Sequence, residues 1–166
     1  MMTPDVAQDL AQQLVERAIK AGATAADVLL GADSASGVSV RLGELEDVDR
    51  SESEEAGLRV FVGQRSASVA SSDLSDDALD LLVERAVAMA REAPEDQFAG
   101  LAPPELLLRE AWPDLDAFDP VEPSPADLRA RAKSAEQAAR AVSGVTNSNG
   151  GSASWSSSVV ALATSG

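Results

Sequence analysis

The spacing of apolar residues near the start of the chain is that of a helix with one buried face. Apolar side chains recur every three to four positions after Pro4, which suits the first turn of a helix, and the pattern stops at Gly22. The stripe consists of Val6, Ala7, Leu10, Ala11, Leu14, Val15, Ala18 and Ile19. With Thr3 as a candidate cap, this pattern predicts a helix over residues 4–21.

Apolar and polar residues then alternate, as they do in strands with one buried face. The alternation predicts four strands, over residues 26–32, 38–48, 57–63 and 66–72. The first two should be joined by a turn over residues 31–37, and the last two by the hairpin turn Gly63-Gln64-Arg65-Ser66. Because links of hairpin length join antiparallel neighbours, the sheet should be antiparallel.

A second helix is predicted to begin at Ser75 and to cover one face of this sheet. Asp76 and Asp77 follow Ser75 and are favourable at the positive end of a helix dipole. The buried stripe of the helix, which ends before Pro94, consists of Leu79, Leu82, Val83, Ala86, Val87 and Ala90.

The last part of the chain predicts a third helix and a final strand. Ser124-Pro125-Ala126-Asp127 combines a capping hydroxyl, a proline at the first helical position and an acidic third residue. The helix should run to Val142. Residues 154–164 have the pattern of a strand, which follows the turn Asn147-Ser148-Asn149-Gly150-Gly151.

Seven of the eight prolines lie in residues 94–125, which predicts an extended connector there. Several of its residues are apolar enough to lie against a surface. They are Leu101, Leu106, Leu107, Leu108, Trp112, Leu115 and Phe118.

These elements predict an α+β fold in two layers, in which an antiparallel sheet of about four strands has helices on one face. Residues 1–93 should form an α-β-β-β-β-α domain, and residues 94–123 a proline-rich connector packed on its surface. Residues 124–166 should supply a helix and one or more strands, the start of a truncated further region. A strand so close to the end of the sequence suggests a fragment of a longer protein.

Composition narrows the possible functions. The chain has 28 acidic and 13 basic residues and a formal net charge of -15, which repels phosphate backbones and anionic lipids. We expect no direct nucleic-acid or membrane binding and, without a signal-peptide pattern, a cytoplasmic location. The chain contains no histidine and no cysteine, so Ser-His and Cys-His catalytic pairs and ordinary zinc or copper sites are excluded within it.

The acidic run over residues 44–55 is the most distinctive local feature. It contains Glu44, Glu46, Asp47, Asp49, Glu52, Glu54 and Glu55, and Arg50 is its one cation. Carboxylates of this kind could hold Ca²⁺ or Mg²⁺. Their spacing lacks the ordered pattern of a calcium loop. The acidic run is therefore better explained as a solvated strand edge and loop.

Isolated acidic and basic residues have structural explanations. Asp73, Asp76 and Asp77 lie where carboxylates cap a helix and complement its dipole. Lys20 and Lys133 are the only lysines, and both lie on predicted helices, where a solvent-facing side chain is favoured over a Schiff base.

Serines and glycines offer no catalytic pattern. The serine-rich stretches at residues 66–75 and 152–158 contain no Gly-x-Ser-x-Gly turn, and no base is available to activate a hydroxyl. Asn149-Gly150-Gly151 has the residues of a turn and lacks the lysine of a phosphate-binding loop. We therefore assign no catalytic, cofactor-binding or metal-binding residue.

Five segments, in their order and spacing, resemble the N-terminal part of the TldD/PmbA family. They are Gly57-Leu58-Arg59-Val60-Phe61-Val62, Ala67-Ser68-Val69-Ala70-Ser71-Ser72-Asp73-Leu74-Ser75, Pro113-Asp114-Leu115-Asp116-Ala117-Phe118-Asp119-Pro120, Ala135-Glu136-Gln137-Ala138-Ala139 and Thr146-Asn147-Ser148-Asn149-Gly150-Gly151-Ser152. The third and fifth segments look more like the PmbA (TldE) branch than the TldD branch.

The resemblance implies a role in a zinc-dependent peptidase assembly whose subunits were long labelled modulators of DNA gyrase. In that family the TldD-type subunit carries a His-Glu-x-x-x-His zinc motif in a region beyond the part that this sequence represents, and the PmbA-type subunit lacks the motif. Nothing in this sequence matches those ligands, so no catalytic residue is carried over, whichever branch the longer protein belongs to. The resemblance to the PmbA branch implies zinc only in a TldD-type partner and no cofactor in this chain. The implied partners are a TldD-like subunit and the peptide substrates of the complex.

Two functions of different classes remain open. The chain could be the non-catalytic N-terminal domain of a PmbA/TldE-like subunit that helps to wall the peptide-access cavity of a cytoplasmic metalloprotease complex. Alternatively, it could be a stand-alone acidic protein-binding or adaptor module that recruits a basic partner. A third possibility, a carboxylate-dependent enzyme, would require two buried acids in different environments.

Overall fold

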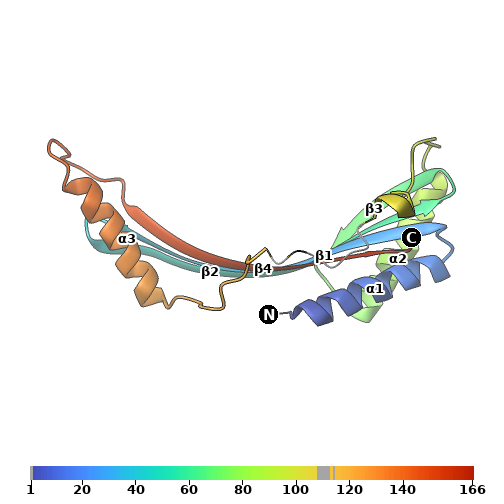
Figure 1. Cartoon of the computed structure of the whole chain (residues 1–166), viewed down its shortest axis with the longest axis horizontal. Coiled ribbons are helices and arrows are strands. Elements are labelled where there is room, and N and C mark those ends of the chain that lie inside the picture. Colours follow the sequence, from blue (N-terminus) through green and yellow to red (C-terminus); the bar gives the residue numbers. More distant parts are fainter. Residues whose placement is uncertain (1, 108–112, 114) are drawn as a thin grey trace. The chain divides into compact units, whose positions relative to one another are not determined.

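The computed structural model describes residues 2–107, 113 and 115–166. Figure 1 shows the helices and strands along this part of the chain. In chain order they are α1 (Pro4–Lys20), β1 (Ala25–Arg41), β2 (Glu44–Val62), β3 (Arg65–Ser71), α2 (Asp76–Glu92), the short 3₁₀ helix η1 (Pro104–Leu106), α3 (Pro125–Arg140) and β4 (Gly151–Thr164). None of these helices has the length and hydropathy that crossing a membrane requires.

The strands form one antiparallel sheet in the order β3-β2-β1-β4. Strand β3 pairs with the end of β2, where Val60 lies opposite Ala67 and Leu58 opposite Val69. The predicted α+β fold with an antiparallel sheet of about four strands is therefore confirmed.

The predicted boundaries of the first three strands are wrong: β2 runs without a break from Glu44 to Val62, and the predicted turn over residues 31–37 is not formed. Strand β1 continues through residues 31–37, where the turn was expected, and the chain instead turns at Leu42 and Gly43, with φ angles of 51° and 84°. Gly31 and Gly37 are tolerated inside the strand, and the buried side chains of Ala32 and Ser34 continue its alternation. Residues 1–93 therefore supply three strands, and β4 completes the sheet.

The helix predictions are confirmed to within two residues at each end. The Thr3 hydroxyl accepts a hydrogen bond from the Val6 N–H at 3.4 Å, which caps α1. Ser124 and Asp127 form a capping box at the start of α3. Ser75 lies at the N-cap of α2, but its side chain makes no capping hydrogen bond.

The chain divides into two compact units. Unit 1 comprises Met1–Ala32, Ser53–Pro113 and Ser158–Gly166. Its core lies between the sheet and the helices α1 and α2, and alanines on both helices are fully buried, which allows close packing. The strand residues of this core are Ala26, Val28, Leu30, Ala56, Leu58, Val60, Ala161 and Ala163.

Unit 2 comprises Asp33–Glu52 and Asp114–Ser157. Helix α3 buries Leu128, Ala132 and Glu136, and β1 buries Val38 and Val40. The two units are each built from separate stretches of the sequence. The domain boundaries at residues 93 and 123 stay a prediction.

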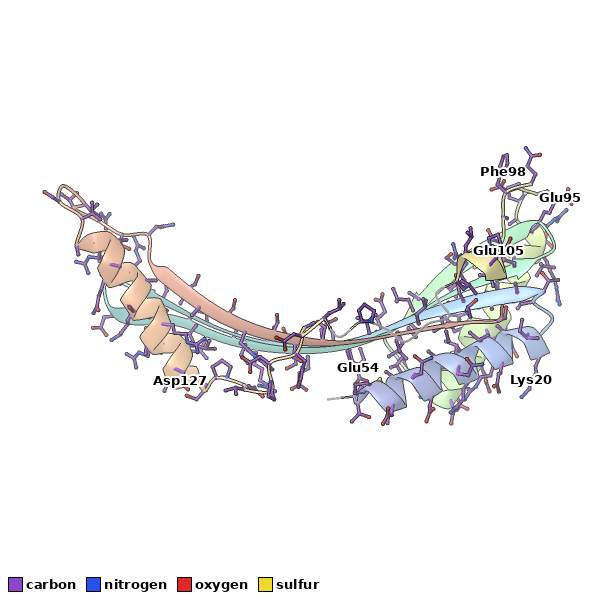
Figure 2. The ribbon with its side chains drawn as sticks, in the orientation of Figure 1. Lys20, Glu54, Glu95, Phe98, Glu105 and Asp127 are labelled. Carbon is purple, nitrogen blue, oxygen red and sulfur yellow. The ribbon has the colours of Figure 1, made fainter. Side chains whose placement is uncertain are left out.

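The connector between α2 and α3 exposes most of its described apolar side chains. Phe98 is 86% exposed and projects from its loop (Figure 2), although its N–H is held by the Asp96 carboxylate at 2.9 Å. Leu106, Leu115 and Phe118 are exposed, whereas Leu101 and Leu107 are half-buried. Leu108, Trp112 and Asp114, which the connector prediction and the family resemblance include, lie outside the described residues.

Candidate functional site

The acidic run lies along β2, where the side chains of residues 44–55 are exposed. Arg50 forms ion pairs with Glu52 at 2.8 Å and with Glu122 at 2.9 Å. Within residues 2–107, 113 and 115–166, no group of three or more Asp, Glu, His or Cys side chains could hold a metal ion. The run fits a solvated strand edge, although it contains no loop after Glu44. The expected absence of a metal site in the whole chain stays a prediction.

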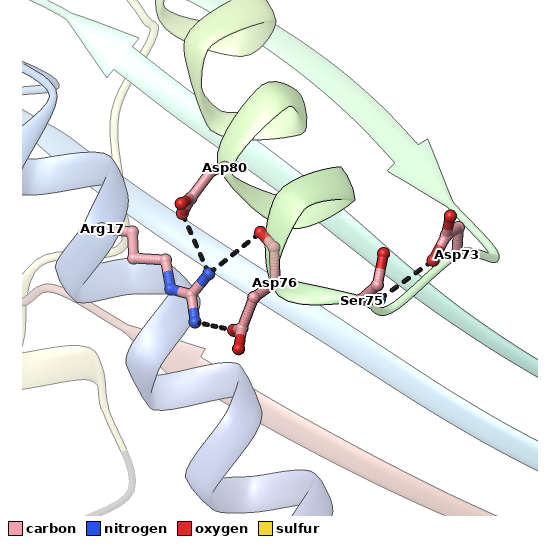
Figure 3. Close-up of polar contacts among 5 residues, drawn as sticks. All are labelled: Arg17, Asp73, Ser75, Asp76 and Asp80. Carbon is pink, nitrogen blue, oxygen red and sulfur yellow. Dashed lines mark hydrogen bonds and ion pairs between the residues drawn. The ribbon is translucent and has the colours of Figure 1, made fainter.

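The acidic residues around the start of α2 join α2 to α1. The Asp73 carboxylate accepts the Ser75 N–H at 3.0 Å, and this backbone hydrogen bond lowers the pKa of Asp73. Arg17 of α1 donates to Asp76 at 2.5 Å and to Asp80 at 2.9 Å, as Figure 3 shows. The prediction of a capping role fits Asp73, whereas the side chain of Asp76 binds a cation from another helix.

The lysines lie on helices as predicted, and the glycine turn has a structural role. Lys20 lies exposed in the last turn of α1 (Figure 2), and Lys133 on α3 is half-buried. Gly150 has φ 110°, and a Cβ there would lie 2.6 Å from the Val40 carbonyl oxygen. A Cβ on Gly151 would lie 2.5 Å from the Ala132 carbonyl oxygen. The two glycines are therefore required by close packing against β1 and α3.

Glu136 is a buried carboxylate that joins α3 to the turn between β1 and β2. Its two oxygens accept the N–H groups of Leu42 and Gly43 at 2.7 and 2.8 Å. Burial alone would raise the pKa of Glu136, but these hydrogen bonds and one from Ser148 hold the pKa below its ordinary value. The ionised side chain satisfies two backbone donors and so fixes the turn.

We expect the stability of the chain to depend on the charge of Glu136. Because its pKa is lower in the folded state, its contribution is present above the unfolded pKa and is lost as the pH falls through the folded pKa. Glu136→Gln should therefore lower the Tm at pH 7, by about 5 °C. The difference in Tm should shrink as the pH falls below the unfolded pKa and through the lowered folded pKa of Glu136.

Thermal unfolding followed by circular dichroism between pH 3 and pH 8 would measure this difference. Glu84→Gln is the matched control, because Glu84 is exposed on α2 and should show little difference at any pH. Equal Tm values for the wild type and Glu136→Gln at pH 7 would contradict the assignment.

A hollow with the character of a binding site lies in unit 1, on the sheet face opposite α1 and α2. Its volume is about 590 Å³, and it is lined by Asp27, Val28, Leu29, Gly57, Leu58, Arg59, Ser68, Val69, Ala70 and Leu162. Leu29 and Leu162 are 56% and 61% exposed. An outward sheet face that is solvated normally carries polar side chains, so the two exposed leucines make this part of the face unusually apolar.

Arg59 and Asp27 are the charged pair of this hollow. The Arg59 Nε donates to the Asp27 carboxylate at 3.0 Å, and Nη2 donates to its second oxygen. The guanidinium also lies over the ring of Phe61, with Cζ 5.3 Å from the ring centroid. Its hydrogen bonds to Asp27 raise the pKa of Arg59, so it stays charged. Ion pair and ring together fix the orientation of the guanidinium.

Neither Arg59 nor Asp27 was predictable as a functional residue from the sequence. The available signal was an arginine between Leu58 and Val60 and an aspartate between Ala26 and Val28, each in the outward position of its strand. That alternation predicts a solvent-facing residue. The pairing of β1 with β2 is what brings the two side chains together.

Comparisons of the sequence with known proteins agree on one family. Residues 26–90 match the family model of PmbA/TldA metallopeptidase domain 1. The Metalloprotease PmbA of Escherichia coli O157:H7 is 40% identical over 128 residues, which are 76% of this chain and 28% of that protein. The Metalloprotease PmbA homolog of Haemophilus influenzae is 37% identical over 139 residues, 83% of this chain and 30% of the homolog. The chain thus spans less than a third of the length of these relatives.

Solved structures share the fold. A crystal structure from Bacteroides thetaiotaomicron, of a protein named as a modulator of DNA gyrase, superposes with a TM-score of 0.84 at 22% identity, over 99% of this chain and 38% of that one. TldE from Thermococcus kodakarensis superposes with a TM-score of 0.72 at 17% identity, over 92% of this chain and 34% of that one.

Proposed function

The chain belongs to the PmbA/TldD family, and from that premise we propose that it is the non-catalytic N-terminal domain of a PmbA/TldE-like subunit. In this proposal the subunit acts with a TldD-like subunit in a cytoplasmic, zinc-dependent peptidase complex. The domain itself contributes a surface that positions the peptide or the partner, and the partner contributes the metal.

One observation carries the proposal: a chain without histidine or cysteine matches the first domain of a metallopeptidase family. Catalytic zinc is bound by three protein ligands that include at least one histidine, with one position left for water. The carboxylates of the described residues form no metal-binding group. The residues of this chain therefore do not fit a catalytic zinc, and they supply no metal-activated water for amide hydrolysis.

The sheet supports a positioning role. Its hollow combines apolar walls with one oriented ion pair, which is the usual composition of a ligand site. Amide hydrolysis needs an activated water and stabilisation of the developing oxyanion, and in this proposal both come from the TldD-like subunit.

Cleavage of an unstructured peptide tests the proposal. The longer PmbA-like protein that carries this domain, a TldD-like protein and their mixture would each be assayed with and without a chelator. We expect cleavage by the mixture alone, and loss of that cleavage with the chelator. Chelator-sensitive cleavage by the PmbA-like protein alone would overturn the non-catalytic assignment. Failure of the two proteins to associate or to cleave would favour the acidic adaptor module instead.

A further inference from the structure

We propose that the hollow on the open sheet face of unit 1 is a carboxylate-binding site for an extended apolar peptide, and that Arg59 binds the carboxylate. The choice of a peptide as the ligand rests on the proposed function. The carboxylate specificity rests on the hydrogen bonds of Arg59 and on the walls of the hollow.

Among residues 2–107, 113 and 115–166, only Asp27 hydrogen-bonds to the Arg59 guanidinium, and it takes one of the two carboxylate-binding edges. A guanidinium can hold a carboxylate through Nε and Nη2 or through Nη1 and Nη2. Asp27 occupies the first edge. Among the described residues, nothing hydrogen-bonds to Nη1, and the Arg59 side chain is half exposed. A second carboxylate can therefore be bound at the remaining edge.

The guanidinium is already oriented for this ligand. Asp27 holds it from one side, and the Phe61 ring, which is only 3% exposed, supports its face. The Asp27 side chain is 19% exposed and is itself ordered by the pair. Since the arginine loses little rotational freedom on binding, more of the hydrogen-bond energy remains available for affinity.

The walls of the hollow suit small apolar side chains in an extended peptide. Gly57, Ser68 and Ala70 leave space above β2 and β3, and Leu29 and Leu162 border it. A volume of about 590 Å³ lies within the range of small-ligand sites. These walls favour an apolar peptide, and Arg59 favours one that carries a carboxylate.

The charges around the site favour a preference for carboxylates but not a high affinity. Asp27 and the bound carboxylate share one guanidinium, and the chain carries a net charge of -15, so long-range repulsion opposes an anionic ligand. The same repulsion disfavours a second copy of this chain on the same face. We therefore expect weak binding with a clear preference for a carboxylate over its neutral amide.

A matched pair of peptides tests the preference on this 166-residue chain. Acetyl-Leu-Ala-Leu-Ala would be titrated with a free C-terminal carboxylate and with a C-terminal amide, and binding would be followed by NMR shifts. We expect the free acid to bind about 10-fold more tightly than the amide.

Variants assign the preference to one residue. Arg59→Gln should abolish the difference between the two peptides, and Arg59→Lys, which keeps the charge and loses the two-point geometry, should keep part of it. Arg85→Gln is the matched control, because Arg85 is exposed on α2 outside the hollow. It should leave the difference unchanged.

The outcomes separate this inference from the proposed function. Equal affinity for acid and amide would overturn the inference, as would an equal loss of both affinities in Arg59→Gln with the preference retained. The proposed ligand group is the C-terminal carboxylate, so an amidated peptide that ends in glutamate should bind more weakly than the free acid, and tighter binding of the glutamate peptide would contradict that choice. Failure of the mixed subunits to cleave peptide would overturn the proposed function without changing these affinities.

Discussion

Gly151→Ala should destabilise unit 2 by about 2–3 kcal/mol, because the added methyl group has no space. Its Cβ would lie 2.5 Å from the Ala132 carbonyl oxygen and 3.1 Å from the Glu136 backbone nitrogen. Both atoms belong to the backbone of α3, so relief requires a movement of the helix and not of a flexible side chain. Thermal unfolding should show a Tm lower by roughly 5–10 °C.

Gly31→Ala is the matched control for this substitution. Gly31 lies in β1, and a Cβ there would meet no atom within 4 Å. The Tm of Gly31→Ala should change little, because the free energy of unfolding of this variant should stay within about 0.5 kcal/mol of the wild-type value. If Gly151→Ala were as stable as Gly31→Ala, the inference that the glycine turn packs closely against α3 would be wrong.

Leu58→Ala should have a comparable effect in unit 1, with a loss of about 3 kcal/mol. Leu58 is 1% exposed and lies in the core between the sheet and its two helices. The substitution removes buried apolar surface and leaves a cavity that a close-packed interior fills only in part. Urea unfolding of the purified chain would measure the loss as a lower midpoint.

Leu162→Ala provides the comparison on the opposite face of the same sheet. Leu162 is 61% exposed, so its removal should change the stability by less than about 0.5 kcal/mol. Similar losses for the two leucines would show that the outward face is covered in this chain. The pair therefore tests which face of the sheet is buried.

The helices of this protein were predictable because their signals are local. The residues that start α1 and α3 lie within one turn of the stripes they precede, and the caps at Thr3 and Ser124 form as expected. Local signals of this kind did not predict that β1 continues through residues 31–37. Gly31 and Gly37 have the composition of a turn, whereas the real turn at Leu42 and Gly43 lies inside a run of alternating residues.

The functional candidates were not predictable because they depend on contacts between residues that are far apart in the sequence. Arg59 lies 32 residues from Asp27, and Glu136 lies more than 90 residues from the turn whose N–H groups it binds. Each residue alone has the pattern of an exposed polar position. Only the order of the strands and the packing of α3 distinguish an oriented guanidinium and a buried carboxylate from ordinary surface charges.

The two borders of the sheet differ in a way that determines where strand addition can occur. Strand β3 pairs only with residues 56–62 of β2, so among the described strands none adjoins the acidic run on that side. A strand that approached this border would meet seven carboxylates. At the opposite border, β4 contains no charged residue and no proline over its 14 residues. A strand that extends this sheet is therefore expected to be added beside β4.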